Sequence, residues 1–131
     1  MSVISYTFKH ERMVNVKLSE VVEILGAKVL AGEDCLDTEV ASACGCDLMS
    51  DVLAFVKDRA LLLTGLMNPQ VVRTAEMMDI SAIVFVRGKD PDESIIEMAK
   101  AKDMVIMTTE LPLYIACGEL YTNGLVGKKR G

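Results

Sequence analysis

The sequence is poor in the residues on which several functions depend. Of its 131 residues none is Trp, 5% are aromatic, and His10 is the single histidine. The core therefore has to be aliphatic, built from Val, Ile, Leu and Ala together with nine Met. Ser–His–acid and Cys–His catalytic arrangements lack their usual base, because His10 lies in a segment that fits the later pattern poorly. We expect the protein not to be an enzyme.

Two further absences concern partners and location. No stretch approaches the roughly 18 uninterrupted apolar residues of a membrane span, and no signal sequence opens the chain. The formal net charge of −5 argues against nucleic acid or an anionic membrane as the main partner, since both need a concentrated basic surface. The expected location is the cytoplasm.

The length and a hydrophobic content of 51% predict one domain with a core that needs neither disulfides nor a metal. Residues 1–12 are predicted to be an N-terminal lead, disordered or not native, because Met13 resembles a natural start. Residues 13–127 form the predicted α/β domain. Residues 128–131 are a basic tail, which we interpret as a solvated end rather than a binding arm.

The most informative stretch runs from Leu61 to Asp90, where two strand–turn–helix units follow each other. Each apolar strand stops at a glycine, and each following helix opens on a capping residue and a proline, as in Asn68-Pro69 and Asp90-Pro91. This pattern predicts a parallel βαβ unit.

The rest of the chain alternates in the same way. Strands are predicted at 27–31, 40–46, 60–64, 81–86 and 104–107, and helices at 20–25, 48–56, 69–78, 91–101 and 113–121. The last three strands are continuous apolar runs, as expected when helices cover both faces of a sheet. The predicted fold class is α/β, a three-layer α/β/α single domain with a mostly parallel sheet of about five strands.

Two local features carry more specific expectations. Helix caps are predicted at Ser19, Asp47, Asp90 and either Thr108 or Thr109. The segment Val40–Cys46 consists almost wholly of small residues, which let another backbone come close. It is therefore predicted to be a central strand, or one that lies under a crossing helix or a partner subunit.

The four cysteines do not have the spacing of a structural zinc site, because the single Cys44-Gly-Cys46 has no matching second pair. We interpret Cys44, Cys46 and Cys117 as small core residues. No metal and no cofactor are expected, and neither of the two standard glycine-rich nucleotide motifs occurs. A metal or redox role for Cys35, Cys44 and Cys46 is the weaker alternative.

The candidate ligand-binding residues lie where three successive strands end. Cations, hydroxyls, flexible glycines and helix amino-termini together suit a phosphate or a carboxylate. The candidates are Thr64, Gly65, Asn68, Arg73, Arg87, Gly88, Lys89, Thr108 and Thr109. The alternative is ordinary turn chemistry, in which Arg87 and Lys89 only balance Asp90 and Asp92.

The segments Ala60–Lys89 and Ala116–Tyr121 resemble a stand-alone DRTGG-domain protein, and the likeness runs from about Met13 to Gly127. DRTGG domains accompany phosphate acetyltransferases and nucleotide-sensing CBS domains of pyrophosphatases, and small ones are often encoded near iron-hydrogenase genes. The resemblance implies an α/β fold, homodimerisation and a regulatory or assembly role. It brings no catalytic residues.

Together these observations favour a non-catalytic regulatory module that binds a small phosphorylated or nucleotide ligand at the carboxyl edge of the sheet. The alternative is a dimeric protein–protein interaction or assembly module without a small-molecule ligand. In that case the segment Val40–Cys46 and the helix that carries Met77 and Met78 build the dimer or dock a hydrogenase-related or signalling protein.

Overall fold

The parallel sheet expected from the βαβ pattern forms the middle layer of the fold in a computed structural model, which describes residues 15–56 and 59–127. The strand order is β2-β7-β6-β5-β4. Strands β4 to β7 run parallel to their neighbours, and β2 pairs antiparallel with β7. Their bounds are β2 Lys28–Ala31, β4 Ser42–Gly45, β5 Ala60–Thr64, β6 Ala82–Phe85 and β7 Val105–Thr108.

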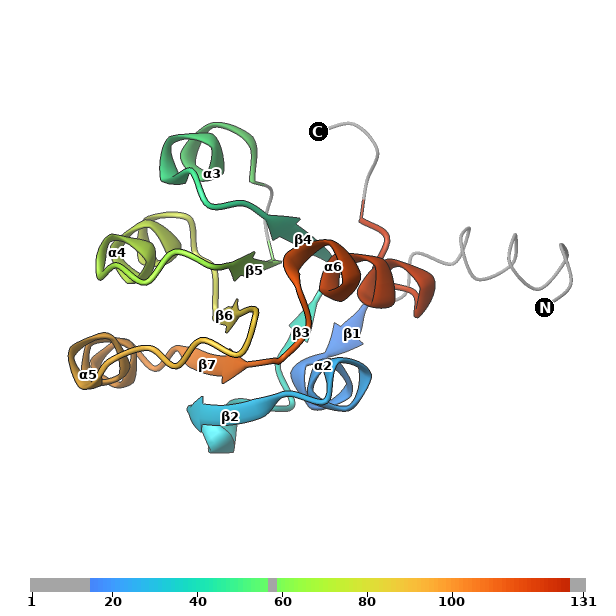
Figure 1. The fold of residues 1–131 in the computed structure, drawn as a ribbon, viewed down its shortest axis with the longest axis horizontal. Coiled ribbons are helices and arrows are strands. Elements are labelled where there is room, and N and C mark those ends of the chain that lie inside the picture. Colours follow the sequence, from blue (N-terminus) through green and yellow to red (C-terminus); the bar gives the residue numbers. More distant parts are fainter. Residues whose placement is uncertain (1–14, 57–58, 128–131) are drawn as a thin grey trace, which may run out of the picture.

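Helices cover both faces of this sheet, which explains the unbroken apolar runs of β5, β6 and β7. On one side lie α3, α4 and α5, and on the other lie α2 and α6 (Figure 1). Two cores result, one on each face, and both are aliphatic apart from Phe85. The helix bounds are α2 Leu18–Leu25, α3 Met49–Phe55, α4 Gln70–Met77, α5 Glu93–Ala101 and α6 Leu113–Thr122. The predicted three-layer class and its mostly parallel five-stranded sheet are confirmed.

A small second sheet holds the N-terminal part of the domain together. Strand β1 (Val16–Lys17) pairs antiparallel with β3 (Glu39–Val40), and the short 3-10 helix η1 (Glu33–Cys35) lies between β2 and β3 along the chain. Helix α2 ends at Gly26, whose φ of +58° is the left-handed conformation that a glycine adopts at low cost.

Two predicted caps are replaced by a neighbouring residue. Ser19 lies inside α2, whose N-cap is Lys17. Helix α5 is capped by Asp92 rather than by Asp90, because an Asp92 oxygen accepts the Ile95 N–H at 3.1 Å. The Asp90-Pro91 pair therefore precedes the helix instead of opening it.

The predicted caps at Asp47 and at Thr108 or Thr109 are wrong because these side chains have partners elsewhere. The N-cap of α3 is Leu48, not Asp47, and that of α6 is Pro112. The Thr108 hydroxyl donates to the Lys89 carbonyl at 2.7 Å. The Thr109 hydroxyl donates to the Leu25 carbonyl at 2.8 Å and so ties α2 to the end of β7.

Strand β4 lies at an edge of the sheet, so the prediction of a central strand is wrong. The alternative expectation, a strand under a crossing helix, is confirmed by α6. A Cβ placed on Gly45 would lie 2.6 Å from the Cys117 sulfur and 3.3 Å from a Leu113 methyl group. The small residues of β4 therefore make room for α6.

Two predicted segments, the lead 1–12 with His10 and the tail 128–131, lie outside the described residues. Within 15–56 and 59–127, every helix is too short or too polar to cross a bilayer.

Candidate functional site

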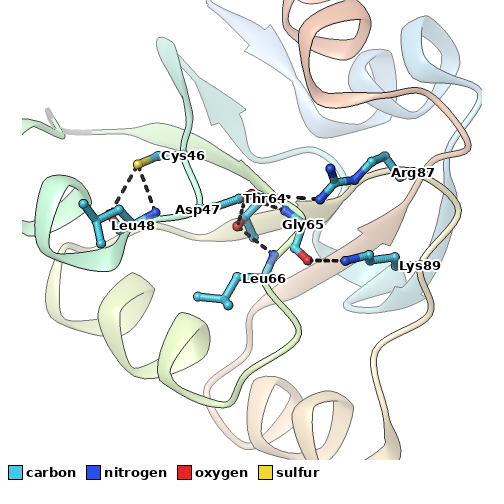
Figure 2. A network of polar contacts seen from close by, with 8 residues as sticks. All are labelled: Cys46, Asp47, Leu48, Thr64, Gly65, Leu66, Arg87 and Lys89. Carbon is cyan, nitrogen blue, oxygen red and sulfur yellow. Dashed lines mark hydrogen bonds and ion pairs between the residues drawn. The ribbon is translucent and has the colours of Figure 1, made fainter.

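Parallel pairing brings the carboxyl ends of four strands to one edge of the domain. Asp47 follows β4, Thr64 ends β5, Arg87 follows β6 and Thr108 ends β7. Because β4, β5, β6 and β7 are neighbours in that order, these residues lie side by side at the edge that the sequence singled out. Figure 2 shows the polar network among the first three of these strand ends.

Asp47 is the centre of this network, although the sequence assigned it to a helix cap. One carboxylate oxygen accepts the Gly65 N–H at 2.8 Å and the Thr64 hydroxyl at 3.0 Å. The hydrogen bond from Gly65, followed by that from Thr64 and the charges of Arg87 and Lys89, lowers the pKa of Asp47 against an opposing effect of partial burial. Asp47 is therefore ionised throughout the neutral range.

Arg87 reaches toward Asp47 from the turn after β6. Its guanidinium Nη2 lies 3.9 Å from an Asp47 oxygen, and both side chains are 50% exposed. The guanidinium lies across Gly65, where a Cβ would collide with it. The backbone of Arg87 is in the left-handed region at φ +64°, which is uncommon for a residue with a side chain. The N–H of Arg87 donates to the Leu111 carbonyl at 2.9 Å, which fixes the turn.

Lys89 approaches the same glycine from the other side of that turn. Its ammonium donates to the Gly65 carbonyl at 3.0 Å, while its own carbonyl accepts the Thr108 hydroxyl. Between the two cations, Gly88 has φ +67° and lies against the carboxylate of Glu110. The turn from Arg87 to Lys89 is thus held on both sides by the ends of β5 and β7.

Three predicted site residues keep their side chains outside the network. The Asn68 side chain accepts the Gln70 N–H at 2.8 Å and so occupies the first free donor of α4. The Thr109 side chain is buried and bonded to Leu25, although the Thr109 carbonyl accepts the Gly88 N–H at 2.8 Å. Arg73 is exposed on α4, and its side chain makes no hydrogen bond or ion pair within the described part of the chain. The predicted cluster therefore reduces to Thr64, Gly65, Arg87, Gly88, Lys89 and Thr108.

Asp47 was missed because an acidic residue before an apolar stretch also fits a helix cap. The signal that could have found it is its position two residues after the end of β4, which is equivalent to that of the turn residues after β5 and β6.

The cluster has two cationic side chains that could receive an anion. Arg87 and Lys89 are balanced by the carboxylates of Asp47 and Glu110, so an anion would have to replace a carboxylate as the partner of a cation. The Arg87–Asp47 contact is long and half exposed, and such pairs contribute little to stability. The guanidinium can thus exchange Asp47 for the oxygens of a phosphate, which it matches in bidentate geometry.

The cysteines do not form a comparable centre. Burial, and next the neighbouring Cys46, raise the pKa of Cys44 to about 11, and burial also raises the pKa of Cys117. These two thiols are therefore protonated at neutral pH, whereas nucleophiles and metal ligands are thiolates. In the described ranges no three Cys, His, Asp or Glu side chains are grouped to hold a metal ion.

Comparisons with known proteins agree with this fold. The sequence profile described as the DRTGG domain matches residues 20–116. No curated protein sequence matches the chain. A similar solved structure holds the CBS and DRTGG domains of the regulatory region of Clostridium perfringens pyrophosphatase, complexed with the activator diadenosine tetraphosphate. Its TM-score is 0.66 at 15% identity, over 96% of this chain and 52% of that chain, so the present chain spans about half of it.

Proposed function

Since the chain belongs to the DRTGG domain family, we propose that it is a non-catalytic regulatory module that senses a small phosphorylated ligand at the carboxyl edge of its sheet. The proposed binding residues are Arg87 and Lys89, supported by Thr64, Gly65, Gly88 and Thr108. Without ligand, the Asp47 carboxylate is the ion-pair partner of the Arg87 guanidinium.

The single observation that carries this proposal is the placement of the Arg87 guanidinium across Gly65. A non-glycine residue at φ +64° costs roughly 1 to 2 kcal/mol, and such costs concentrate at functional sites. The turn places the guanidinium across a glycine that leaves room for it, half exposed and only loosely paired. Arg59, Asp79 and Asp103 share the left-handed backbone, so the feature that distinguishes Arg87 is the glycine beneath its guanidinium.

A nucleotide that carries several phosphates is the first ligand to test. The regulatory region that the fold resembles is described as complexed with its activator, diadenosine tetraphosphate. Several linked phosphates would contact Arg87 and Lys89 together, because both side chains reach Gly65. Inorganic phosphate and pyrophosphate serve as smaller probes of the same chemistry.

The test is a titration calorimetry series with diadenosine tetraphosphate, ATP, pyrophosphate and phosphate on wild type and Arg87→Ala. We expect one of the polyphosphates to bind, and Arg87→Ala to weaken that binding by about tenfold, as for loss of one charged contact of roughly 1.4 kcal/mol.

Arg59→Ala is a matched control. Arg59 also has a left-handed backbone (φ +59°), a half-exposed side chain (52%) and one carboxylate partner, Glu39 at 3.6 Å. It precedes β5, however, and so lies at the opposite end of that strand. Equal loss of affinity in both variants, or no binding by any probe to folded wild type, would contradict the proposal.

A second candidate function, the assembly module, is favoured by apolar side chains left on the surface. Tyr114 is 86% exposed, and Ile115 and Tyr121 of the same helix are also exposed. A hydrogenase-related or signalling partner and a cytoplasmic location stay predictions from the resemblance and from composition.

A further inference from the structure

The outer edge of β4 is open in the described part of the chain, where β4 pairs with β5 alone. The Cys46 N–H donates to the Leu63 carbonyl of β5 at 3.0 Å, and hydrogen-bonding directions alternate along a strand. The N–H and C=O groups of Ala43 and Gly45 therefore point away from β5. Both residues are exposed. Free backbone groups at a sheet edge pair readily with another strand.

Strand β1 already lies on this side of the chain. Its residue Val16 pairs antiparallel with Val40 of β3. The next residue, Ala41, donates its N–H to the carbonyl of Arg59, which directly precedes β5, at 2.9 Å. Because neighbouring residues of an extended chain direct their polar groups to opposite sides, Val40 meets β1 on the side away from β5. Strand β1 and the open edge of β4 are thus on the same side.

A one-residue bulge separates β3 from β4. By the same alternation Ser42, four residues before Cys46, directs its polar groups toward β5, and the N–H of its neighbour Ala41 also points there. Two successive residues that point to one side form a β-bulge, which shifts the register by one residue. Strands β3 and β4 are consequently one bulged strand, and β1 covers its outer side as far as Val40.

The side chains on the two faces of the sheet agree with this continuity. Val16 is buried in the core beneath α2 and α6. Gly45 faces α6, since a Cβ placed on it would meet the Cys117 sulfur, and Ala43 shares this face because side chains alternate along a strand. A strand that continues β1 toward the amino terminus would carry Val14 on the same face, opposite Ala43.

The connection of the chain selects the occupant of this edge. The described residues begin at Asn15, whose side-chain amide donates to the Glu39 carboxylate of β3 at 3.3 Å. The segment 12–14 therefore starts beside the open edge. Gly127 lies against Ser42 at the bulge and leaves the edge beyond it exposed. A strand from another molecule would lose translational and rotational freedom on pairing here, and a segment of the same chain avoids that cost.

We propose that residues 12–14 of this chain form a strand that pairs antiparallel with β4 and covers its open edge. In this register Val14 is the hydrogen-bonded partner of Ala43. Arg12, the last residue of the predicted lead, is that of Gly45. The parallel sheet thereby gains a sixth strand. Because β4 leads into the polar network of the candidate site, the added strand also supports the strand end on which that network is centred.

Amide hydrogen exchange of the full chain, followed by NMR, tests this pairing. The N–H groups of Ala43 and Gly45 are expected to exchange at least tenfold more slowly in wild type than in Val14→Pro. Proline offers no N–H to the Ala43 carbonyl and interrupts the ladder. Met13→Pro is the matched control, because the N–H of Met13 points away from β4 in this register, where an edge strand tolerates proline. The slow exchange should persist in that variant.

Every result of this experiment bears on the proposal. Fast exchange of both amides in folded wild type, slow exchange that survives Val14→Pro, or equal loss in the two proline variants would overturn it. Protection that grows with protein concentration would assign the edge to a second copy and overturn it as well. If Val14→Pro is unfolded, wild type still decides, because the register brings the α-protons of Met13 and Cys44 together as a non-hydrogen-bonded pair. Absence of their nuclear Overhauser effect would refute the pairing.

Discussion

Asp47 joins the end of β4 to the turn after β5 through one carboxylate oxygen that accepts both Thr64 and Gly65. Replacing it with Asn leaves at most one good acceptor and no charge. We expect Asp47→Asn to lower the free energy of unfolding at pH 7 by about 1 kcal/mol, because charged hydrogen bonds at a half-exposed site are partly compensated by water. Urea unfolding of both proteins measures this difference.

The difference in unfolding free energy between wild type and Asp47→Asn should shrink at acid pH. The pKa of Asp47 is lower in the folded protein than in the unfolded chain, so its carboxylate stabilises the fold at every pH above the unfolded pKa of about 3.9. That contribution is lost as the pH falls through the folded pKa. The gap between wild type and Asp47→Asn should therefore be constant from neutral pH to about pH 5 and close below about pH 4. A gap that persists undiminished at lower pH would show that charge plays no part.

Two buried threonines should respond oppositely to the same replacement. The Thr74 hydroxyl is buried and has no partner among the described residues, whereas that of Thr109 donates to Leu25 at 2.8 Å. Thr74→Val should raise the free energy of unfolding by about 1 kcal/mol, and Thr109→Val should lower it by about 1 to 3 kcal/mol since the Leu25 carbonyl loses its donor. Urea unfolding at fixed pH gives both values, and changes of the same sign would refute the contrast.

At the scale of single elements, two nearby acidic residues, Asp90 and Asp92, could each act as the N-cap of α5. Asp92 accepts the Ile95 N–H and the Ser94 hydroxyl, and these bonds lower its pKa. Asp92→Ala should lower the melting temperature by several degrees, as expected for a lost N-cap, and Asp90→Ala should change it little. Thermal unfolding of the two variants distinguishes them, and equal losses would mean that Asp92 does not act as the cap.

The existence of most elements could be predicted because their signal is local. Strand β5 was predicted at its observed bounds, and β6 and β7 within one residue at each end, since a buried apolar run needs no knowledge of its neighbours. The helix starts were less predictable. Asp90 and Asp92 both fit a cap, and Asp47, Thr108 and Thr109 are bonded to residues far away in sequence, which no local pattern encodes.

At the scale of the whole molecule, strand order is what sequence reasoning could not supply. The small residues of β4 predicted either a central strand or one under a crossing helix; the strand lies at an edge, and Gly45 makes room for α6. The candidate site was predictable in part for the opposite reason. In a parallel sheet every strand ends at the same edge, which the sequence predicts, and the pairing of β5 with β6 then brings Thr64 close to Arg87 and Lys89.

Binding at the proposed ligand site should depend on salt, because Arg87 and Lys89 attract a polyphosphate through their charges. This attraction is screened as the Debye length falls from about 10 Å at 0.1 M salt to about 3 Å at 1 M. We expect the polyphosphate dissociation constant to rise between these conditions, measured by calorimetry. Arg87→Ala should flatten this response, because one of the two attracting charges is gone. A wild-type dissociation constant that is the same at both salt concentrations would exclude binding through these two cations.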